Sequence, residues 1–499
     1  MQLQFDKQSC RCLQQIKRNQ QNQEQTQELR LPDGMPDVGS ILASWGQVLL
    51  RSKEWRGGGM SVSGGVMAWV LYAPEGGGEP QCVESWIPFQ MKWDFEDTQR
   101  DGTIQVHCFL RSLDARSASA RKLVLRANVG VLAEATLPSE MTVYTPGQLP
   151  EDIQILKKTY PVRLPKEAGE KSFTLEEELL LPPSVPAMQK LLAYQMQPEL
   201  LDRKIMAGKV VFRGVGQVHI VYLGEDGCVH SWDFEIPFSQ YGDLDGEYDQ
   251  DATARILPVL TAMEMEHTPE GKLNLKCGLA MQYKIYCREM LDLVEDAYST
   301  NRVITPQWEQ LQLPALLDTC EQNLQAEQTV AAEGNQIADV VCYYDHAAVT
   351  SGDGSSEIAA DGYFQLLYYD GQGELKCVMP RWETQWNLMM DESSTVQTML
   401  LPTGKPQASL GGGNATMWAE TLTDTVVLSA VGMPMVCGLE IGDKTVQDAE
   451  RPSLILCKAG TGGLWDVAKR CGSTVSAIQK ANRLEKEPDP EQILLIPIA

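Results

Sequence analysis

Short runs of alternating apolar and polar residues recur along most of the chain. They carry β-branched and aromatic residues and include Val66–Tyr72, Lys209–Phe212, Gln217–Tyr222 and Gly278–Cys287. Such alternation is typical of strands that bury one face. After one run, Glu225-Asp226-Gly227 has the composition of a hairpin turn. The pattern predicts a mainly β chain built from sandwich-like or barrel-like units.

Short helices and one unusual polar stretch complete this first prediction. We expect short helices near Ile41–Ala43, Ala187–Ala193 and Pro306–Gln312. The Gln-rich stretch Gln14–Gln27 is interpreted as either a polar strand or a mobile arm. Glu176–Glu178 is expected at a solvated strand edge, where charge discourages edge-to-edge aggregation.

An internal repeat organises the chain. Tyr72 and Tyr222 end matching apolar runs 150 positions apart, and the Ile-Pro-Phe triplets that follow, ending at Phe89 and Phe238, are 149 apart. A third copy ends its run at Tyr368, but Met-Pro-Arg-Trp382 replaces its triplet. Similarity at a fixed period indicates repeated structural units. We therefore predict β units at 1–146, 150–303 and 304–447, the third of them divergent.

The last 47 residues have a different pattern. Apolar residues recur at helical spacing in two short stretches, namely Leu464, Val467 and Ala468, then Val475 and Ile478. Thr474 stands where its side chain would cap the second helix, and Gly472 suits a left-handed residue that closes the first. A short apolar strand ends at Pro497. The pattern predicts a small β-α-α-β unit at 453–499, after a polar linker at Lys444–Ser453.

This segment resembles a LysM module. The resemblance rests on a Gly turn before Leu464-Trp465, a Gly-Ser-Thr-Val step and the Asn482-x-Leu484 sequence. LysM modules bind and do not catalyse. The resemblance implies a docking groove formed by Gly460, Thr461, Gly462, Gly463, Leu464, Asn482, Arg483 and Leu484. The usual Gly-Asp-Thr-Leu-Trp turn is altered here, so a protein ligand and a glycan ligand both stay open. We expect Leu464 and Trp465 to serve packing more than ligand contact.

The repeat is similar to the SPOCS domain, once a domain of unknown function. The matching residues are the Tyr222-Leu-Gly-Glu-Asp-Gly227 turn, the Phe-Glu-Ile-Pro-Phe238 run and Val294–Ser299. Several SPOCS units followed by one LysM module resemble the layout of spore coat morphogenetic proteins of Firmicutes. The fold implied is therefore a mainly β chain of tandem SPOCS repeats followed by a small α+β LysM module.

The resemblance also implies a function. It indicates a non-enzymatic scaffold or adaptor in spore coat assembly, tethered through its LysM module to a coat-basement ATPase on the forespore surface, in the mother-cell cytoplasm. Other coat proteins are further expected partners, and self-association stays open. The alternative is a cell-wall or cortex protein that binds peptidoglycan, a polymer containing N-acetylglucosamine.

Composition and charge exclude several other classes. The net charge of −25 argues against nucleic acid and anionic lipid as partners. No apolar run approaches the roughly 18 residues of a membrane-spanning helix, so no membrane insertion is expected. The first 34 residues lack an apolar signal core and a cleavage site, which predicts a cytoplasmic protein. The 13 cysteines are odd in number and scattered, unlike a disulfide framework.

No candidate for catalysis, metal binding or cofactor binding emerges from the motifs. There is no His-x-x-x-His, no Cys-x-x-Cys and no phosphate-binding Gly-Lys-Ser/Thr loop. His219 and His230 are expected to pack across strands. The remaining weak candidates are His107-Cys108, Cys342 with Asp345-His346, and Cys10-x-Cys12. We therefore expect no enzyme activity, no cofactor and no metal.

Overall fold

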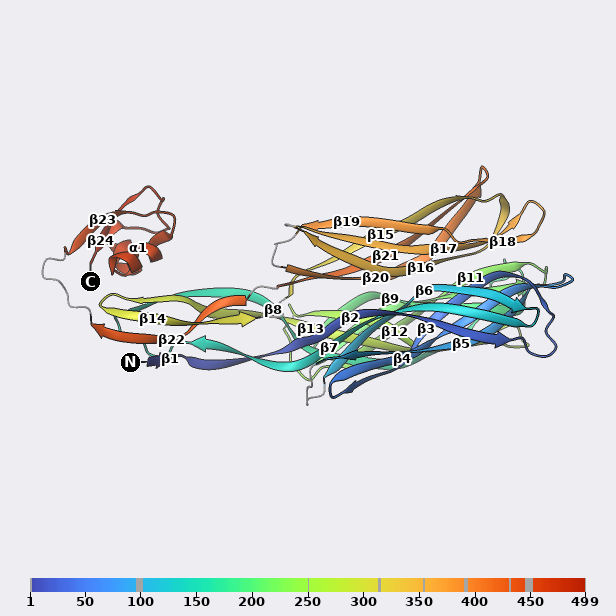
Figure 1. The fold of residues 1–499 in the computed structure, drawn as a ribbon, viewed down its shortest axis with the longest axis horizontal. Coiled ribbons are helices and arrows are strands. Elements are labelled where there is room, and N and C mark those ends of the chain that lie inside the picture. The colour runs from blue at the N-terminus through green and yellow to red at the C-terminus, as the bar shows by residue number, and fades with distance from the viewer. Residues whose placement is uncertain are drawn as a thin grey trace.

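The computed structural model describes residues 2–95, 102–249, 251–312, 316–352, 355–389, 394–429, 432–444 and 452–498. These residues form 24 strands and two short helices, so the prediction of a mainly β chain is confirmed. The molecule is elongated, and a wide β-rich head narrows into a stalk that contains β1 (Gln2–Gln4), β14 (Arg302–Gln312) and β22 (Gly432–Lys444) (Figure 1). A small body lies at the end of the stalk. It contains strands β23 (Leu454–Lys458) and β24 (Ile493–Pro497) and helix α1 (Gly463–Cys471).

The first predicted unit contains two three-stranded antiparallel sheets. Its strands are β2 (Asp6–Arg30), β3 (Val38–Arg56), β4 (Gly59–Pro74), β5 (Gln81–Asp94), β6 (Thr103–Ser119) and β7 (Lys122–Thr145). The sheet orders are β3-β4-β5 and β2-β7-β6. Gln14–Gln27 lies within β2 and pairs along β7, so this stretch is a polar strand and not an arm.

The second predicted unit repeats this arrangement. Its strands are β8 (Ile153–Leu179), β9 (Met188–Met206), β10 (Lys209–Gly224), β11 (Val229–Asp243), β12 (Thr253–His267) and β13 (Leu273–Ser299). The strand order β9-β10-β11 corresponds to β3-β4-β5, and β8-β13-β12 corresponds to β2-β7-β6. The sequence repeat is therefore a repeat of strand order.

The third predicted unit keeps the pattern with interruptions. Its strands are β14 (Arg302–Gln312), β15 (Leu316–Ala331), β16 (Gly334–Gly352), β17 (Ser355–Asp370), β18 (Leu375–Val378), β19 (Arg381–Met389), β20 (Ser394–Gly411), β21 (Asn414–Ser429) and β22 (Gly432–Lys444). Both β18 and β19 pair with β17, so they replace the single strand β5 or β11. The unit boundaries stay a prediction, and the predicted linker Lys444–Ser453 lies outside the described residues except at its two ends.

The three expected short helices are wrong, because these residues lie in or beside β3, β9 and β14. Each of these strands has register shifts. In β3 the pairing with β4 skips Leu42, and in β9 the pairing with β10 skips Gln189 and Leu192. A bulge places two successive residues against one partner and interrupts the two-residue alternation of a strand. The sequence in these places therefore imitates irregular or helical spacing.

The repeated Ile-Pro-Phe triplet positions an aromatic ring over a glycine of the neighbouring strand. The cross-strand pairs are Gly64 with Phe89, Gly214 with Phe238, and Gly362 with Trp382. A Cβ at position 214 would lie 2.4 Å from the Phe238 ring and 2.3 Å from the backbone oxygen of Glu199. Trp382 is thus the third unit's counterpart of the triplet phenylalanine, although the triplet itself is absent.

The repeated tyrosines of the first two units anchor the segments that lead into β3 and β9. Tyr72 and Tyr222 are almost fully buried, and each hydroxyl donates to the carbonyl of a proline 36 residues earlier, Pro36 at 3.0 Å and Pro186 at 3.2 Å. A buried phenol needs such a hydrogen-bond partner. This contact accounts for the repeated spacing between a proline and the tyrosine.

The stalk is held by a hydrophobic cluster to which all three predicted units contribute. Phe5 and Tyr144 come from the first unit, Leu293 from the second, and Leu311 and Val436 from the third. Strand β1 (Gln2–Gln4) pairs with β22, with Gln2 opposite Glu440. The first residues of the chain and the last strand of the third unit therefore lie in one sheet at the stalk end (Figure 1).

Candidate functional site

The C-terminal module, residues 453–498, has the predicted β-α-α-β order. Strands β23 and β24 are antiparallel, and α1 and α2 (Val475–Asn482) pack on one face of this ribbon. Thr474 accepts a hydrogen bond from the backbone N–H of Ala477 at 3.1 Å, and Gly472 is left-handed with φ of 65°. Both predicted helix-end residues therefore act as expected.

The first half of the predicted groove lies in the turn before α1. Gly460, Thr461 and Gly462 are exposed there. Leu464 is instead 1% exposed and belongs to the module core. Its backbone N–H donates to the carboxylate of Glu487 at 3.1 Å, a contact that ties the start of α1 to the loop after α2. A carboxylate is favourable at a helix N-terminus, so this contact stabilises the turn.

The second half of the groove is mostly structural. The side-chain amide of Asn482 donates to the carbonyl of Leu495 and accepts from its N–H, both at 2.7 Å. Leu484 packs on the module core. Arg483 is exposed and, among the described residues, is the one non-glycine residue with positive φ, 53°. Of the predicted groove residues, Gly460–Gly462 and Arg483 are thus the exposed ones, and their role in ligand binding stays a prediction.

The module is mounted on the end of β13 by helix α1. Tyr298 is 5% exposed, packs with the module core and donates its hydroxyl to the backbone oxygen of Ser473 at 2.8 Å. Its ring meets Trp465 edge-on, with 4.8 Å between centroids. The Trp465 indole N–H donates to Asp296 at 2.8 Å, and Lys469 forms an ion pair with the same carboxylate at 2.6 Å. Trp465 is therefore a packing residue, as expected, but its partner is the stalk.

A β-bulge in β13 directs the side chains of Asp296 and Tyr298 towards the module. The pairing of β13 with β8 shifts register between Val294 and Asp296, and Glu295 at the bulge accepts from Tyr160. Bulges re-aim side chains in this way. Burial and the nearby Asp296 raise the pKa of Tyr298 to about 12, so the phenol stays a donor. In the sequence, Asp296 and Tyr298 belong to the Val294–Ser299 segment of the SPOCS resemblance, and nothing in the local pattern indicates that they contact the C-terminal module.

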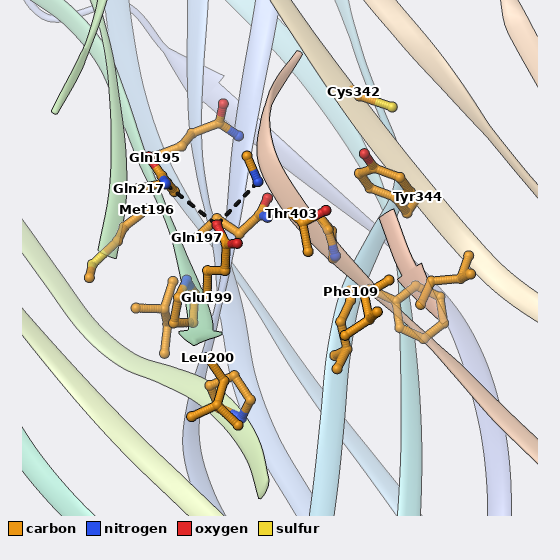
Figure 2. Close-up of a pocket in the computed structure, with 18 of the residues that line it drawn as sticks. Phe109, Gln195, Met196, Gln197, Glu199, Leu200, Gln217, Cys342, Tyr344 and Thr403 are labelled. Atoms are coloured by element: carbon orange, nitrogen blue, oxygen red, sulfur yellow. Dashed lines mark hydrogen bonds between the residues drawn. The ribbon is translucent and has the colours of Figure 1, made fainter. Parts of the chain in front are cut away.

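A cavity of about 500 Å³ lies where the three predicted units meet in the head. Phe109 comes from the first unit, Gln195 and Glu199 from the second, and Tyr344 and Thr403 from the third (Figure 2). Glu199 accepts from Gln217 at 3.4 Å and from the backbone N–H of Gly404 at 3.1 Å, the two bonds dashed in Figure 2. The bond from Gly404 holds a bulge of β20 against β9, and the bond from Gln217 joins β9 to β10.

A buried ionic network joins the same three units beside the cavity. Asp339 of the third unit accepts from the indole of Trp45 in the first unit and from His219 in the second, both at 2.8 Å. The other ring nitrogen of His219 lies 2.7 Å from Asp233. Burial alone would lower the pKa of His219, but the two carboxylates outweigh it and raise the pKa to about 10. The imidazole is therefore charged, a role beyond the expected cross-strand packing.

Among the described side chains, the weak sequence candidates at residues 107–108 and 342–345 do not form a reactive cluster. Burial raises the pKa of the Cys108 and Cys342 thiols to about 12 and lowers that of His107 to about 4. Two guanidinium nitrogens of Arg111, Nε and Nη2, each donate to the carboxylate of Asp345 at 2.6 Å, and the side chain of His346 lies outside the described residues.

The described residues contain neither a metal-ligand group nor a membrane-spanning helix. No group of three or more His, Cys, Asp or Glu side chains there is arranged to hold a metal ion. No helix in the described part of the chain is long and apolar enough to cross a membrane.

Comparison with known protein families identifies part of the second unit. Residues 187–266 match the family model described as SipL, SPOCS domain. This segment includes β9, β10, β11 and most of β12, the strands that carry the repeat in the second unit. The match supports the SPOCS interpretation of that unit and indicates a sporulation-related protein. No curated protein and no solved structure matches the chain.

Proposed function

We propose that this protein is a non-enzymatic scaffold in spore coat assembly, and that its C-terminal module is a LysM module that tethers it to a coat-basement ATPase on the forespore surface, within the mother cell. The SPOCS match in the second unit supports the assignment to sporulation. The strand order of that unit recurs in the first and, with interruptions, in the third. Three such units offer broad surfaces to other coat proteins.

The position of the C-terminal module in the molecule is the observation that best supports its proposed role as a tether. It is held at the stalk end, away from the head, by Asp296 and Tyr298 (Figure 1). Between Ser453 and the C-terminus there are six Lys or Arg and five Asp or Glu, against a net charge of −25 for the chain. A near-neutral module on an acidic body suits docking to a protein. Linked weak contacts then add up to firm attachment.

The test is removal of the module. We expect a chain ending at residue 449 to fold but to lose its position on the forespore when it is fused to a fluorescent protein in sporulating cells. The matched control is the full chain with the same fusion. Normal localisation of the truncated chain would contradict the tether.

The alternative is binding to peptidoglycan through the exposed Gly460–Gly462 turn. Co-sedimentation of the purified full chain and of residues 1–449 with insoluble peptidoglycan separates the two proposals. We expect neither to pellet. Pelleting of the full chain alone would instead favour a wall or cortex protein.

A further inference from the structure

The two edges of the β23–β24 ribbon differ. Backbone hydrogen bonds join Ser453 to Ile498 and Ala459 to Gln492 at the two ends of the ribbon. Because hydrogen-bonded pairs alternate in an antiparallel ladder, the N–H and C=O groups of Leu454, Leu456 and Lys458 point away from β24. These outward groups form what we call the open edge.

The opposite edge of the ribbon is capped. There the outward N–H and C=O of Leu495 are both bonded to the side-chain amide of Asn482, which thus imitates a neighbouring strand. Among the described residues, no strand pairs with the open edge of β23. Natural sheets normally protect their edges. Here one edge is protected and the other is left unprotected.

The face beside the open edge is apolar and exposed. Leu454 is 52% exposed, Leu456 71% and Ile493 63%. They share the face of the ribbon opposite α1 and α2, because Ile455, Cys457, Leu494 and Ile496 occupy the other face. These exposures hold while α1 is mounted on the stalk. The surface is therefore available when the module is in place.

We propose that the open edge of β23 receives an extended segment of a partner protein as a third strand, whose alternate apolar side chains cover Leu454 and Leu456. Backbone groups supply the affinity of such strand addition, and the alternate side chains supply the selectivity. A two-stranded ribbon is marginal, and a third strand stabilises it. The inference rests on the proposed function, because it takes the module for the docking part of the chain.

A second copy of the chain fits this surface less well than a different protein. Each chain has a net charge of −25, so two chains repel one another on approach. The module itself is near neutral, but the field of the acidic chain that carries it favours a neutral or basic segment. The occupant is therefore an apolar, alternating segment with Lys or Arg at its ends.

The experiment uses a fluorescent peptide, Lys-Val-Thr-Val-Thr-Val-Lys, titrated with the full chain and followed by fluorescence anisotropy. The decisive variant is Leu456→Pro. It removes an outward N–H that β24 does not use, and proline is tolerated on edge strands. We expect binding to weaken at least tenfold. Leu456→Thr keeps the N–H but loses the apolar contact, so its binding should weaken several-fold.

The matched control is Leu201→Thr, which changes an equally exposed leucine on β9 in the head and should leave binding unchanged. Hydrogen exchange over residues 454–458 should slow when the peptide is added to the wild type, and exchange in α1 should show that each variant is folded. If Leu456→Pro unfolds the module, Leu456→Thr decides.

Three outcomes would overturn the inference: no peptide binding by the wild type, peptide binding by both Leu456 variants as tight as that of the wild type, or a wild-type dimer that Leu456→Thr abolishes. A Leu456→Pro chain that loses peptide binding but keeps its normal position in cells would show that the open edge is not the tether, and would leave tethering by the module intact. Normal localisation of the 1–449 chain would refute the tether alone.

Discussion

At the scale of single residues, the polar groups that join the three units do most to fix their arrangement. Asp339 accepts from Trp45 and His219, residues that are 294 and 120 positions away in the chain. The sequence placed His219 in a strand but did not identify its partner Asp339, because such pairing depends on how whole units meet. The contact of His219 with Asp233 was easier to anticipate, because the two residues face each other across the expected hairpin.

The charge on His219 makes this junction sensitive to alkali. Its pKa is about 10 when folded and about 6.5 when unfolded, so its contribution is complete below pH 6.5 and is lost as the pH rises through 10. We expect the free energy of unfolding to fall by a few kcal/mol between pH 6 and pH 10.

Urea denaturation at both pH values checks this expectation. His219→Gln should be less stable at pH 6 and should lose less stability on going to pH 10. His230→Gln, on the neighbouring strand, serves as the control and should keep the wild-type pH dependence. An unchanged slope in His219→Gln would refute the assignment.

At the scale of elements, strand content and repeat period could be predicted, while register could not. The alternation of residues 217–222 identified part of β10, and Thr474 and Gly472 marked the ends of the helices. The bulges in β3 and β9 were not visible, because a skipped residue breaks the very alternation that identifies a strand. Likewise, the missing triplet concealed the equivalence of Trp382 to Phe238.

The glycine beneath each triplet aromatic should tolerate no side chain. In Gly214→Ala the new Cβ meets both the Phe238 ring and a backbone oxygen, so we expect a loss of about 1–3 kcal/mol in the free energy of unfolding. Gly371→Ala is the matched control, because nothing lies within 4 Å of its Cβ position. Equal denaturation midpoints for the two variants would show that the strands separate to accept the methyl group.

At the scale of the whole molecule, the stalk gives the C-terminal module a defined mount. The sequence separated the module from the units by a linker, but the contact of Trp465 with β13 spans 169 positions and could not be read from local pattern. Of the predicted groove, Leu464 and Asn482 proved to be structural, because composition does not tell a packing residue from a contact residue.

The mount should weaken when its carboxylate is removed. Asp296→Ala deletes the acceptor for Trp465 and the partner of Lys469, and charge-assisted bonds of this kind contribute about 1.5–3 kcal/mol. We expect amide hydrogen exchange to quicken both in α1 and at residues 296–299. Glu485→Gln, which changes an exposed acid in the loop after α2, should leave both unchanged. Faster exchange in α1 alone would indicate damage to the module and not undocking.

The pairing of β1 with β22 has a consequence for synthesis of the protein. Gln2 lies opposite Glu440, so β1 has no partner in this sheet until more than 430 further residues have been made. Contacts this distant in the chain are costly to close and form late. The first two units can take shape during translation, but the stalk sheet is completed only after β22 has been made. A chain that ends before β22 would therefore leave the edge of β1 unpaired and exposed.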